Sequence, residues 1–549
     1  MAGKGKKSNF LIQGSILAIA SIISRIIGLV YRIPMQQVIG DGGNNLYGTA
    51  YEIYNVFLLI SSFSLPLAVS KLVSTRVAQK DRKNAYRYFK GSLFFAIISG
   101  LAVTLIVFFG AGFFADIMNT PFSYYALRVL APTLFIVAVM GTIRGFFQGL
   151  GTTMPSAISQ IIEQIVNAII SIIASYVLFS YGAKVGAVMG DQKNYAEAYG
   201  AAGGTLGTCI GAVIGLFFIS FVFFAYRPVM KRLIRKEKKN PSESYRRIIR
   251  IVIMTIIPVL LSTTIYNISS VIDNGLFKAI AEHQGYSAEV FGDMWGIFSG
   301  KTKLLLNVPI AIASALAAST VPTLAAAYAN KDMELLRKRI HSAIRFTMLI
   351  AFPCAVGMGV LAGPILQLLF SDTNTLSAQM LSVGAISIIF YSLSTISNGI
   401  LQGIDKMRVP VTNAIYALIL HVAFLVVLMM VFDLNIMAVV MANTFYAFIM
   451  CILNHWGIRK EARYKQEIKK TFLLPGLSSC MMGIIVFGVY KALFMLLKAN
   501  SIATVVAIVI GMLSYAIIMI VSKGITKAEL ETMPKGNILI KIFEKLHLM

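Results

Sequence analysis

The sequence predicts an all-α polytopic membrane protein with fourteen transmembrane helices, arranged as two parallel six-helix repeat bundles around a central cavity plus two extra C-terminal helices. Three observations predict this class. Only 13% of the 549 residues are charged and 57% are hydrophobic, whereas soluble domains carry charge on about a quarter of their residues. Apolar stretches of about 20 residues, the length of a membrane-crossing helix, recur along the chain. Short motifs of the first half also return in the same order in the second half.

Apolar runs separated by polar breaks define the predicted helices. The first run follows Lys4, Lys6 and Lys7 and is too long for the core of a cleavable signal, so we interpret it as a retained helix. The fourteen spans begin near residues 10, 46, 88, 123, 156, 201, 247, 294, 341, 376, 409, 435, 473 and 501.

The distribution of positive charge predicts that both termini are cytoplasmic and that the chain is a multi-pass protein of the bacterial plasma membrane. With that orientation, the inside segments hold 39 of the 49 Lys and Arg. The predicted outer loops at 40–45, 118–122, 281–293 and 371–375 contain neither residue type. The net charge of +26 therefore faces anionic lipid headgroups, and a nucleic-acid partner is excluded.

An ordered internal repeat predicts the two bundles. The motif Gly-x-x-Gln-Gly at 145–149 returns at 399–403. Two further pairs keep the same order, namely 65–68 with 308–311 and 78–81 with 329–332. A repeat unit of six helices enters the membrane twice from the same side, so its copies are related by an axis along the membrane normal and enclose a central cavity.

The repeat divides the chain into four predicted parts. These are an N-terminal six-helix bundle at 1–226, a basic cytoplasmic linker at 227–246, a C-terminal six-helix bundle at 247–458, and the last two helices with a cytoplasmic tail at 459–549.

Positive charges within apolar runs mark a candidate binding site. Arg25 lies midway along the first predicted helix, and Arg32 follows two helical turns later on nearly the same face. Lys301 and Lys303 lie in the eighth predicted span. A central arginine costs roughly 2.5–3.5 kcal/mol to insert, so it is expected to face a wet or anionic interior. We predict that these four residues converge on the cavity and bind an anionic substrate.

Three acidic residues also lie in predicted helices, and two roles stay open for them. Glu52, Glu163 and Asp273 are either structural partners that neutralise Arg or Lys, or groups that couple transport to ions or protons. The sequence leaves open whether sodium, protons or the membrane potential drives the cycle.

Enzymatic chemistry finds no support in the sequence. There is no H-E-x-x-H, G-x-S-x-G or P-loop motif. The four cysteines lie in separate apolar stretches, without the spacing of a zinc site or a disulfide framework. We therefore predict no enzyme activity, no bound metal or cofactor, and no ATP-driven step.

The motif residues resemble a known family. Ser24-Arg25-Ile26-Ile27-Gly28, the segment around Pro66 and the duplicated Gly-x-x-Gln-Gly motif are similar to those of the multidrug/oligosaccharidyl-lipid/polysaccharide exporter superfamily. Within it, the chain resembles the MurJ-type lipid II flippase and stage V sporulation protein B-like branch over essentially its whole length.

The resemblance implies a function in peptidoglycan biosynthesis and cell shape. Members of this branch are understood to move an undecaprenyl-pyrophosphate-linked precursor from the inner to the outer leaflet by alternating access. Arg25 then matches the essential arginine of the first helix, Arg32 resembles the second arginine, and Lys303 stands nearest to an arginine of helix 8. The last two helices resemble a pair that forms a groove for the lipid tail. The implied partners are the lipid-linked anionic glycan precursor, anionic membrane lipids and cell-wall synthesis proteins.

Three alternative functions remain. One is a flippase for another polyprenyl-linked oligosaccharide. Another is a cation-coupled multidrug exporter, in which we would expect a cavity richer in acids. The last is a membrane glycosyltransferase, which would carry catalytic carboxylates in a long outer loop, whereas the longest predicted outer loop covers only 184–200.

Overall fold

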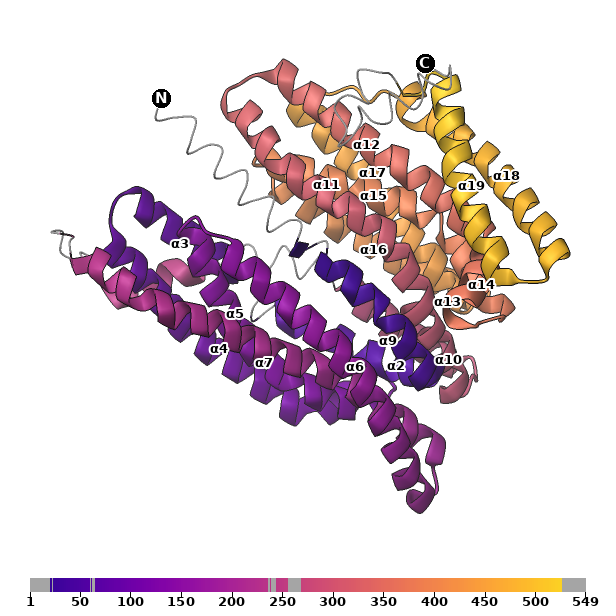
Figure 1. Cartoon of the computed structure of the whole chain (residues 1–549), viewed down its shortest axis with the longest axis horizontal. Coiled ribbons are helices and arrows are strands. Elements are labelled where there is room, and N and C mark those ends of the chain that lie inside the picture. The colour runs from indigo at the N-terminus through magenta and orange to yellow at the C-terminus, as the bar shows by residue number, and fades with distance from the viewer. Residues whose placement is uncertain are drawn as a thin grey trace. The chain divides into compact units, whose positions relative to one another are not determined.

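A computed structural model describes residues 20–21, 23–59, 61, 65–235, 237, 243–254 and 268–525, which form helices joined by short turns, with no strand among them (Figure 1). The predicted all-α class is therefore confirmed. Within these residues, ten helices are long and apolar enough to cross a membrane, and the chain is a multi-span membrane protein. The count of fourteen spans stays a prediction. The N-terminal lysines, part of the predicted basic linker and the tail after residue 525 lie outside the described residues.

Contacts along the chain divide it into two compact units, Met1–Gly300 and Lys301–Met549. The predicted domain boundaries at 226, 246 and 458 stay predictions. In the N-terminal unit, residues 23–30 are helical and are followed by α2 (Arg32–Leu58), α3 (Leu65–Ala78), α4 (Arg82–Ile117), α5 (Ser123–Gly149), α6 (Met154–Met189), α7 (Gln192–Arg235), α9 (Ser269–His283) and α10 (Ala288–Ile297).

A π-helical turn, η2 (Phe298–Thr302), leads into the helices of the C-terminal unit. These are α11 (Lys303–Ala329), α12 (Met333–Val360), α13 (Ala362–Phe370), α14 (Thr375–Gly384), α15 (Ser387–Gly403), α16 (Arg408–Met430), α17 (Ile436–Ala462), the π-helical turn η3 (Lys469–Leu473), α18 (Leu474–Leu497) and α19 (Asn500–Val521).

Two predicted outer loops are shorter in the structure, because 184–200 is helical apart from Gly190 and Asp191, and the break at 40–45 is limited to a kink at Gly40. α6 and α7 continue through 184–200 and are separated only by Gly190 and Asp191, where Gly190 ends α6 with φ 81°. At about 1.5 Å per residue, the 36 residues of α6 measure roughly 54 Å, which exceeds the ~30 Å hydrocarbon core. The α6–α7 hairpin therefore extends beyond the other helices of its unit (Figure 1).

The predicted loop at 40–45 lies inside α2. Gly40 has φ 69° and ψ −175°, so the helix changes direction at this glycine and then resumes. Asn44 donates to the backbone carbonyl of Gly296 at 2.8 Å, and this contact with α10 holds the polar segment in the helix.

Glycines let α6 and α7 approach closely. A Cβ added to Gly203 would lie 2.4 Å from the Ala174 carbonyl oxygen, and one added to Gly207 would lie 2.1 Å from Ser171 Oγ. Larger side chains at these positions would push the two backbones apart. The regular glycine spacing of α7 therefore serves helix packing in the membrane.

The internal repeat reappears as repeated packing within each unit. Gly145 of α5 faces the Pro66 carbonyl of α3, at 2.6 Å from its added Cβ, and Gly399 of α15 faces Ala317 of α11 at 3.0 Å. The turns that follow α3 and α11 also match, because Lys80 and Lys331 both have φ 56°. The motif glycines of α5 and α15 thus pack against the corresponding helices α3 and α11 in the two halves.

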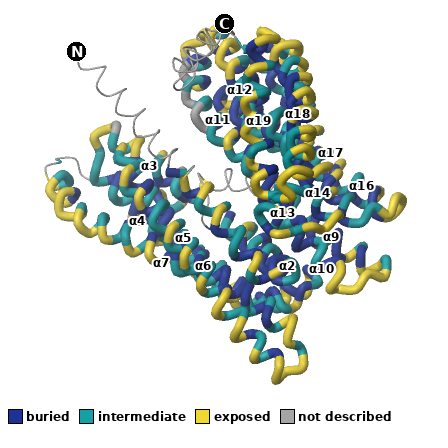
Figure 2. Tube along the Cα trace, turned by 45° about the vertical axis from the view of Figure 1, so that its right-hand side comes forward, coloured by how far each residue is buried: buried dark blue, intermediate teal, exposed yellow. Residues whose placement is uncertain are grey.

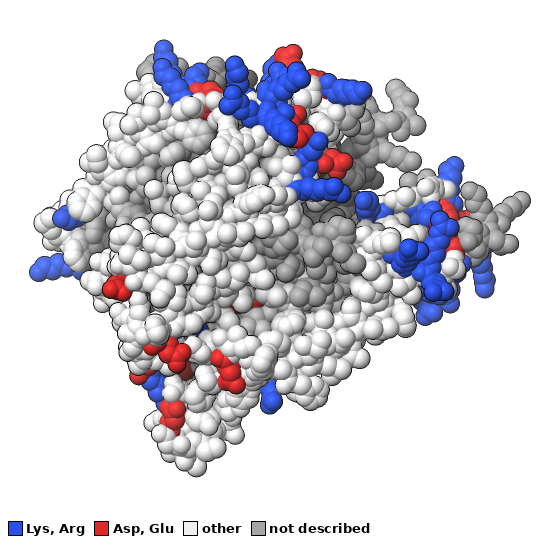
Figure 3. Space-filling model, turned by 180° about the vertical axis from the view of Figure 1, so that it is seen from behind, with Lys and Arg blue, Asp and Glu red and all other residues white. Residues whose placement is uncertain are grey.

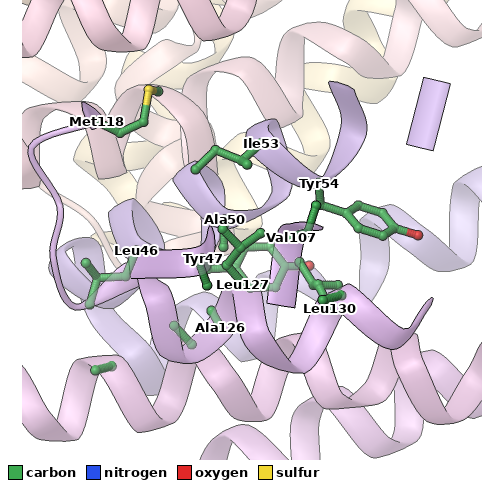
Figure 4. Packing of buried hydrophobic residues seen from close by; sticks show 14 of the residues in the cluster. Leu46, Tyr47, Ala50, Ile53, Tyr54, Val107, Met118, Ala126, Leu127 and Leu130 are labelled. Carbon is green, nitrogen blue, oxygen red and sulfur yellow. The ribbon is translucent and has the colours of Figure 1, made fainter. Parts of the chain in front are cut away.

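Buried side chains lie between the helices and apolar side chains cover the outer faces. In the N-terminal unit, Tyr47 and Ala50 of α2 pack with Leu127 and Leu130 of α5 (Figure 4). Many large apolar side chains are exposed instead, and Figure 2 marks the exposed positions along the helices in yellow. On the face shown in Figure 3, Lys and Arg gather in patches near the edges of the view, beside a broad surface without charged residues. This pattern is typical of a lipid-facing surface.

Candidate functional site

Arg25 lies on the helical segment 23–30, which packs against α6. Ser21 Oγ donates to Gln160 Oε1 at 3.4 Å, and the Gly28 backbone lies close to Gln164. The Arg25 side chain is exposed, and no carboxylate among the described residues pairs with it. Its charge is therefore available to a ligand.

Arg32, at the start of α2, lies against two aromatic rings. Its guanidinium carbon is 5.6 Å from the ring centroid of Tyr51 and 5.7 Å from that of Tyr47. The negative ring faces attract this cation without neutralising it. Arg32 also has no carboxylate partner among the described residues, and its Nε is buried without a hydrogen-bond acceptor there. A buried donor of this kind calls for an acceptor, which an anionic ligand would supply.

A polar network fixes the tyrosines beside Arg32. The Tyr31 and Tyr47 hydroxyls are 3.4 Å apart, and Asn167 Nδ2 donates to the Tyr31 hydroxyl at 3.5 Å. Thr208 Oγ1 donates to Asn167 Oδ1 at 3.3 Å and also pairs with the Tyr51 hydroxyl. The network links α2, α6 and α7, so the Arg32 environment is held by three helices.

Glu52 belongs to a second buried polar cluster, between α2 and α9. Its two carboxylate oxygens accept hydrogen bonds from Ser270 at 2.7 Å and from Asn274 at 2.6 Å. Lys278 Nζ donates to Thr49 Oγ1 at 3.0 Å, is fully buried, and experiences the charge of Glu52. Asp273, the other predicted acid of this region, is also buried on α9.

Lys278 is a residue that the sequence analysis missed, although a signal was present. Ser270, Asn274 and Lys278 recur every four residues and therefore share one face of α9. The lysine itself follows an apolar stretch near the end of the helix, where a snorkelling side chain would be ordinary. Full burial distinguishes it from that case.

Glu163 of α6 forms an ion pair with Arg144 of α5. Arg144 Nη2 lies 2.8 Å from Glu163 Oε2 and 2.7 Å from Ser159 Oγ. The contact places Glu163 beside a cation within the N-terminal unit.

The two predicted lysines of the C-terminal unit differ from one another. Lys301 Nζ lies 2.7 Å from Asp372 Oδ2, and both side chains are nearly inaccessible. Burial opposes ionisation of Asp372, but hydrogen bonds from Lys301, the Asn374 N–H and Ser377 outweigh it and lower the pKa of its carboxyl. Lys303, two residues later at the start of α11, is half-buried. The charge of Lys301 is thus balanced by Asp372.

No group of three or more metal-ligating His, Cys, Asp or Glu side chains occurs within the described part of the chain. Within the N-terminal unit, Arg25 and Arg32 have no carboxylate partner among the described residues, whereas the acids Glu52 and Glu163 accept hydrogen bonds.

Comparison with protein families gives two matches. Residues 11–328 match the family described as "Polysaccharide biosynthesis protein", and residues 303–427 match the MatE family. The first match covers more than half of the chain.

Two proteins of Bacillus subtilis (strain 168) are similar over most of their length. Lipid II flippase MurJ is 26% identical over 493 residues, which are 86% of this chain and 87% of that protein. Stage V sporulation protein B is 24% identical over 544 residues, which are 97% of this chain and 100% of that protein.

Solved structures share the fold. The lipid II flippase MurJ in an inward closed conformation has a TM-score of 0.64 at 14% identity, over 91% of this chain and 97% of that one. An inward-facing multidrug resistance MATE family transporter of the MOP superfamily has a TM-score of 0.61 at 16% identity, over 82% of this chain and 100% of that one.

Proposed function

Because the chain belongs to the polysaccharide biosynthesis protein family of the multidrug/oligosaccharidyl-lipid/polysaccharide exporter superfamily, we propose that it is a lipid II flippase. It moves an undecaprenyl-pyrophosphate-linked peptidoglycan precursor from the inner to the outer leaflet by alternating access. The similarity to lipid II flippase MurJ over 86% of this chain supports the substrate class.

The observation that carries the proposal is the state of Arg25 and Arg32. Neither guanidinium has a carboxylate partner among the described residues, although an uncompensated cation in a membrane helix is expensive. A pyrophosphate provides the missing charge, and its oxygens match the planar fork of an arginine. The substrate headgroup thus needs a hydrated cationic passage, while its polyprenyl tail stays in lipid.

The lysines of the C-terminal unit have separate roles in this proposal. Lys303 adds positive charge as a point cation, without the bidentate geometry of arginine. Lys301 is paired with Asp372 at 2.7 Å, so it contacts substrate only if that pair opens during the transport cycle.

The contacts of Glu163 and Glu52 favour a structural role for these acids over a role in coupling transport to ions or protons. Glu163 faces Arg144, and Glu52 accepts from Ser270 and Asn274 beside Lys278. These contacts neutralise or satisfy the carboxylates inside the N-terminal unit. Sodium, protons and the membrane potential are the alternative driving forces of the cycle.

A flippase for another polyprenyl-linked oligosaccharide is the second candidate. Stage V sporulation protein B matches 97% of this chain, so the similarity by itself does not select lipid II. Both candidates use the same phosphorylated lipid head, and only the attached sugar and peptide differ. A multidrug exporter, suggested by the MatE match at 303–427, would instead carry apolar cations and would gain nothing from unpaired arginines.

Transport by the purified chain in sealed vesicles tests the proposal. Labelled lipid II and a labelled polyprenyl-linked oligosaccharide without the peptide are placed in separate vesicles, and their exposure at the opposite leaflet is followed by accessibility to an enzyme added outside. We expect lipid II to cross with wild type and not with Arg25→Ala. Arg339→Ala, which changes an exposed arginine of α12, is the matched control and should leave transport intact. Normal lipid II transport by folded Arg25→Ala would refute the role of this residue, and transport of only the second lipid would select the other candidate.

A further inference from the structure

Two adjoining cavities of the C-terminal unit share the side chain of Tyr464. One has a volume of about 400 Å³ and lies between α12, α15 and α17. The other has a volume of about 670 Å³ and lies where α12 meets the segment that follows α17. Both volumes fall within the range of small-molecule sites. One cavity is apolar and the other is basic, so a ligand that fills both must have an apolar part and an anionic part.

The smaller cavity is apolar. Leu393, Phe448, Ile452 and Phe472 contribute to its wall, and the exposed Trp456 lies at its edge. At roughly 30 Å³ for a group the size of a water molecule, about 400 Å³ holds roughly 13 carbon groups. That space suits most of one acyl chain, whereas a polyprenyl chain is several times longer.

The larger cavity is basic. It is lined by Arg337, Lys338, His341, Arg463 and Lys465, together with Ser342 and Tyr464. Two hydrogen-bond contacts hold the residues of its wall in place. Arg337 Nε donates to the Ala462 carbonyl at 3.4 Å, and His341 Nδ1 lies 3.3 Å from the Tyr464 hydroxyl.

Carboxylates near the basic cavity are already engaged. Glu334 pairs with Lys338 at 2.9 Å on the exposed face of α12. Glu467 accepts from the Lys470 N–H at 2.6 Å and from Thr471 Oγ1 at 2.8 Å. The remaining cations leave the cavity with an excess of positive charge, which is complementary to a phosphate group.

We propose that the two cavities together bind one anionic phospholipid, with its phosphate against Arg463 and Lys465 and one acyl chain in the apolar cavity. Tyr464 lies at the junction of head and chain because it lines both cavities. Trp456 lines the apolar cavity and is itself exposed, and tryptophan is enriched at membrane interfaces. The site does not depend on the proposed function, since it uses neither Arg25 nor Arg32.

Native mass spectrometry of the full chain in detergent tests this site. The protein is titrated separately with phosphatidylglycerol, phosphatidylcholine, undecaprenyl phosphate and inorganic phosphate. Arg463→Gln with Lys465→Gln removes charge from the headgroup site, and Leu393→Trp fills the apolar cavity. Arg339→Gln with Arg408→Gln removes the same charge from exposed positions that do not line either cavity and is the matched control.

We expect the tightest bound phosphatidylglycerol to weaken by about 5-fold for each basic residue removed, hence by roughly 25-fold in the headgroup double variant. Leu393→Trp should weaken it as well, the control variant should bind like wild type, and phosphatidylcholine should bind more weakly than phosphatidylglycerol to the wild type. Loss of binding in the headgroup variant but not in Leu393→Trp would overturn the proposal in favour of a soluble-anion site, which inorganic phosphate would then fill. Preferential binding of undecaprenyl phosphate, or equal binding by all variants, would also overturn it.

Discussion

Replacing Lys278 with methionine removes a positive charge from the interior of the N-terminal unit. The lysine side chain is 0% exposed, and Glu52, whose charge acts on it, is 8% exposed. Lys278→Met therefore removes a cation whose charge acts on the buried Glu52 carboxylate, together with its hydrogen bond to Thr49. Removing one partner of a buried polar contact typically costs about 1–3 kcal/mol of stability, and more where charge is involved. The double variant Glu52→Gln with Lys278→Met removes both charges and should recover most of that loss.

The assay uses a natural reporter beside the lysine. Trp295 is fully buried and stacks on Phe277, the residue before Lys278, with ring centroids 5.8 Å apart. Trp456→Phe leaves Trp295 as the single tryptophan, because the chain has only 2. Thermal unfolding of the purified protein in one detergent is then followed by fluorescence. We expect the apparent melting temperature to fall in Lys278→Met and to return toward wild type in the double variant. An unchanged melting temperature in Lys278→Met, or a double variant less stable than either single one, would refute the reasoning.

Two further predictions concern packing and pH. Gly203→Ala should destabilise the α6–α7 hairpin by about 1–3 kcal/mol through overpacking, because the new Cβ would lie 2.4 Å from a backbone oxygen. The control Gly112→Ala places its Cβ in open space and should be neutral in the same thermal unfolding assay. Equal effects of the two changes would contradict the packing argument. The Lys301 contact lowers the pKa of the Asp372 carboxyl, so its stabilising effect is fully present above the usual carboxyl pKa and is lost as pH falls through the lowered value. Asp372→Asn should therefore flatten the acid side of a melting-temperature against pH curve, and an unaltered curve would show that this pair does not contribute.

Hydropathy predicted most helices because a membrane helix is a local feature of the sequence. The predicted start at 123 coincides with that of α5, and the starts near 409 and 435 lie within a residue of those of α16 and α17. The failure at 40–45 has a long-range cause. A run of glycine, aspartate and asparagine normally forms a turn, but Asn44 is held by the Gly296 carbonyl, 252 positions away.

In the candidate site, too, the sequence predicts residues that stand out within one helix but not contacts between residues far apart in the chain. Arg25 and Arg32 stand out in one sequence because each interrupts an apolar helix. The pairing of Lys301 with Asp372 bridges 71 positions, and no spacing within a single helix encodes such a contact. Only the burial of Lys278 in the structure distinguishes it from an ordinary lysine near a helix end, whose ammonium group usually reaches water.

The exposed state of Arg25 and the aromatic setting of Arg32 lead to one central claim, namely that these guanidinium groups bind the phosphorylated head of a polyprenyl lipid. Direct binding of lipid II to the purified chain tests it, with the uncharged polyprenol as the comparison ligand. Hydrogen bonds to charged groups contribute roughly 1.5–3 kcal/mol each, so Arg25→Gln with Arg32→Gln should weaken lipid II binding by about 100-fold or more while leaving polyprenol binding unchanged. Undiminished lipid II affinity in the folded double variant would contradict the claim.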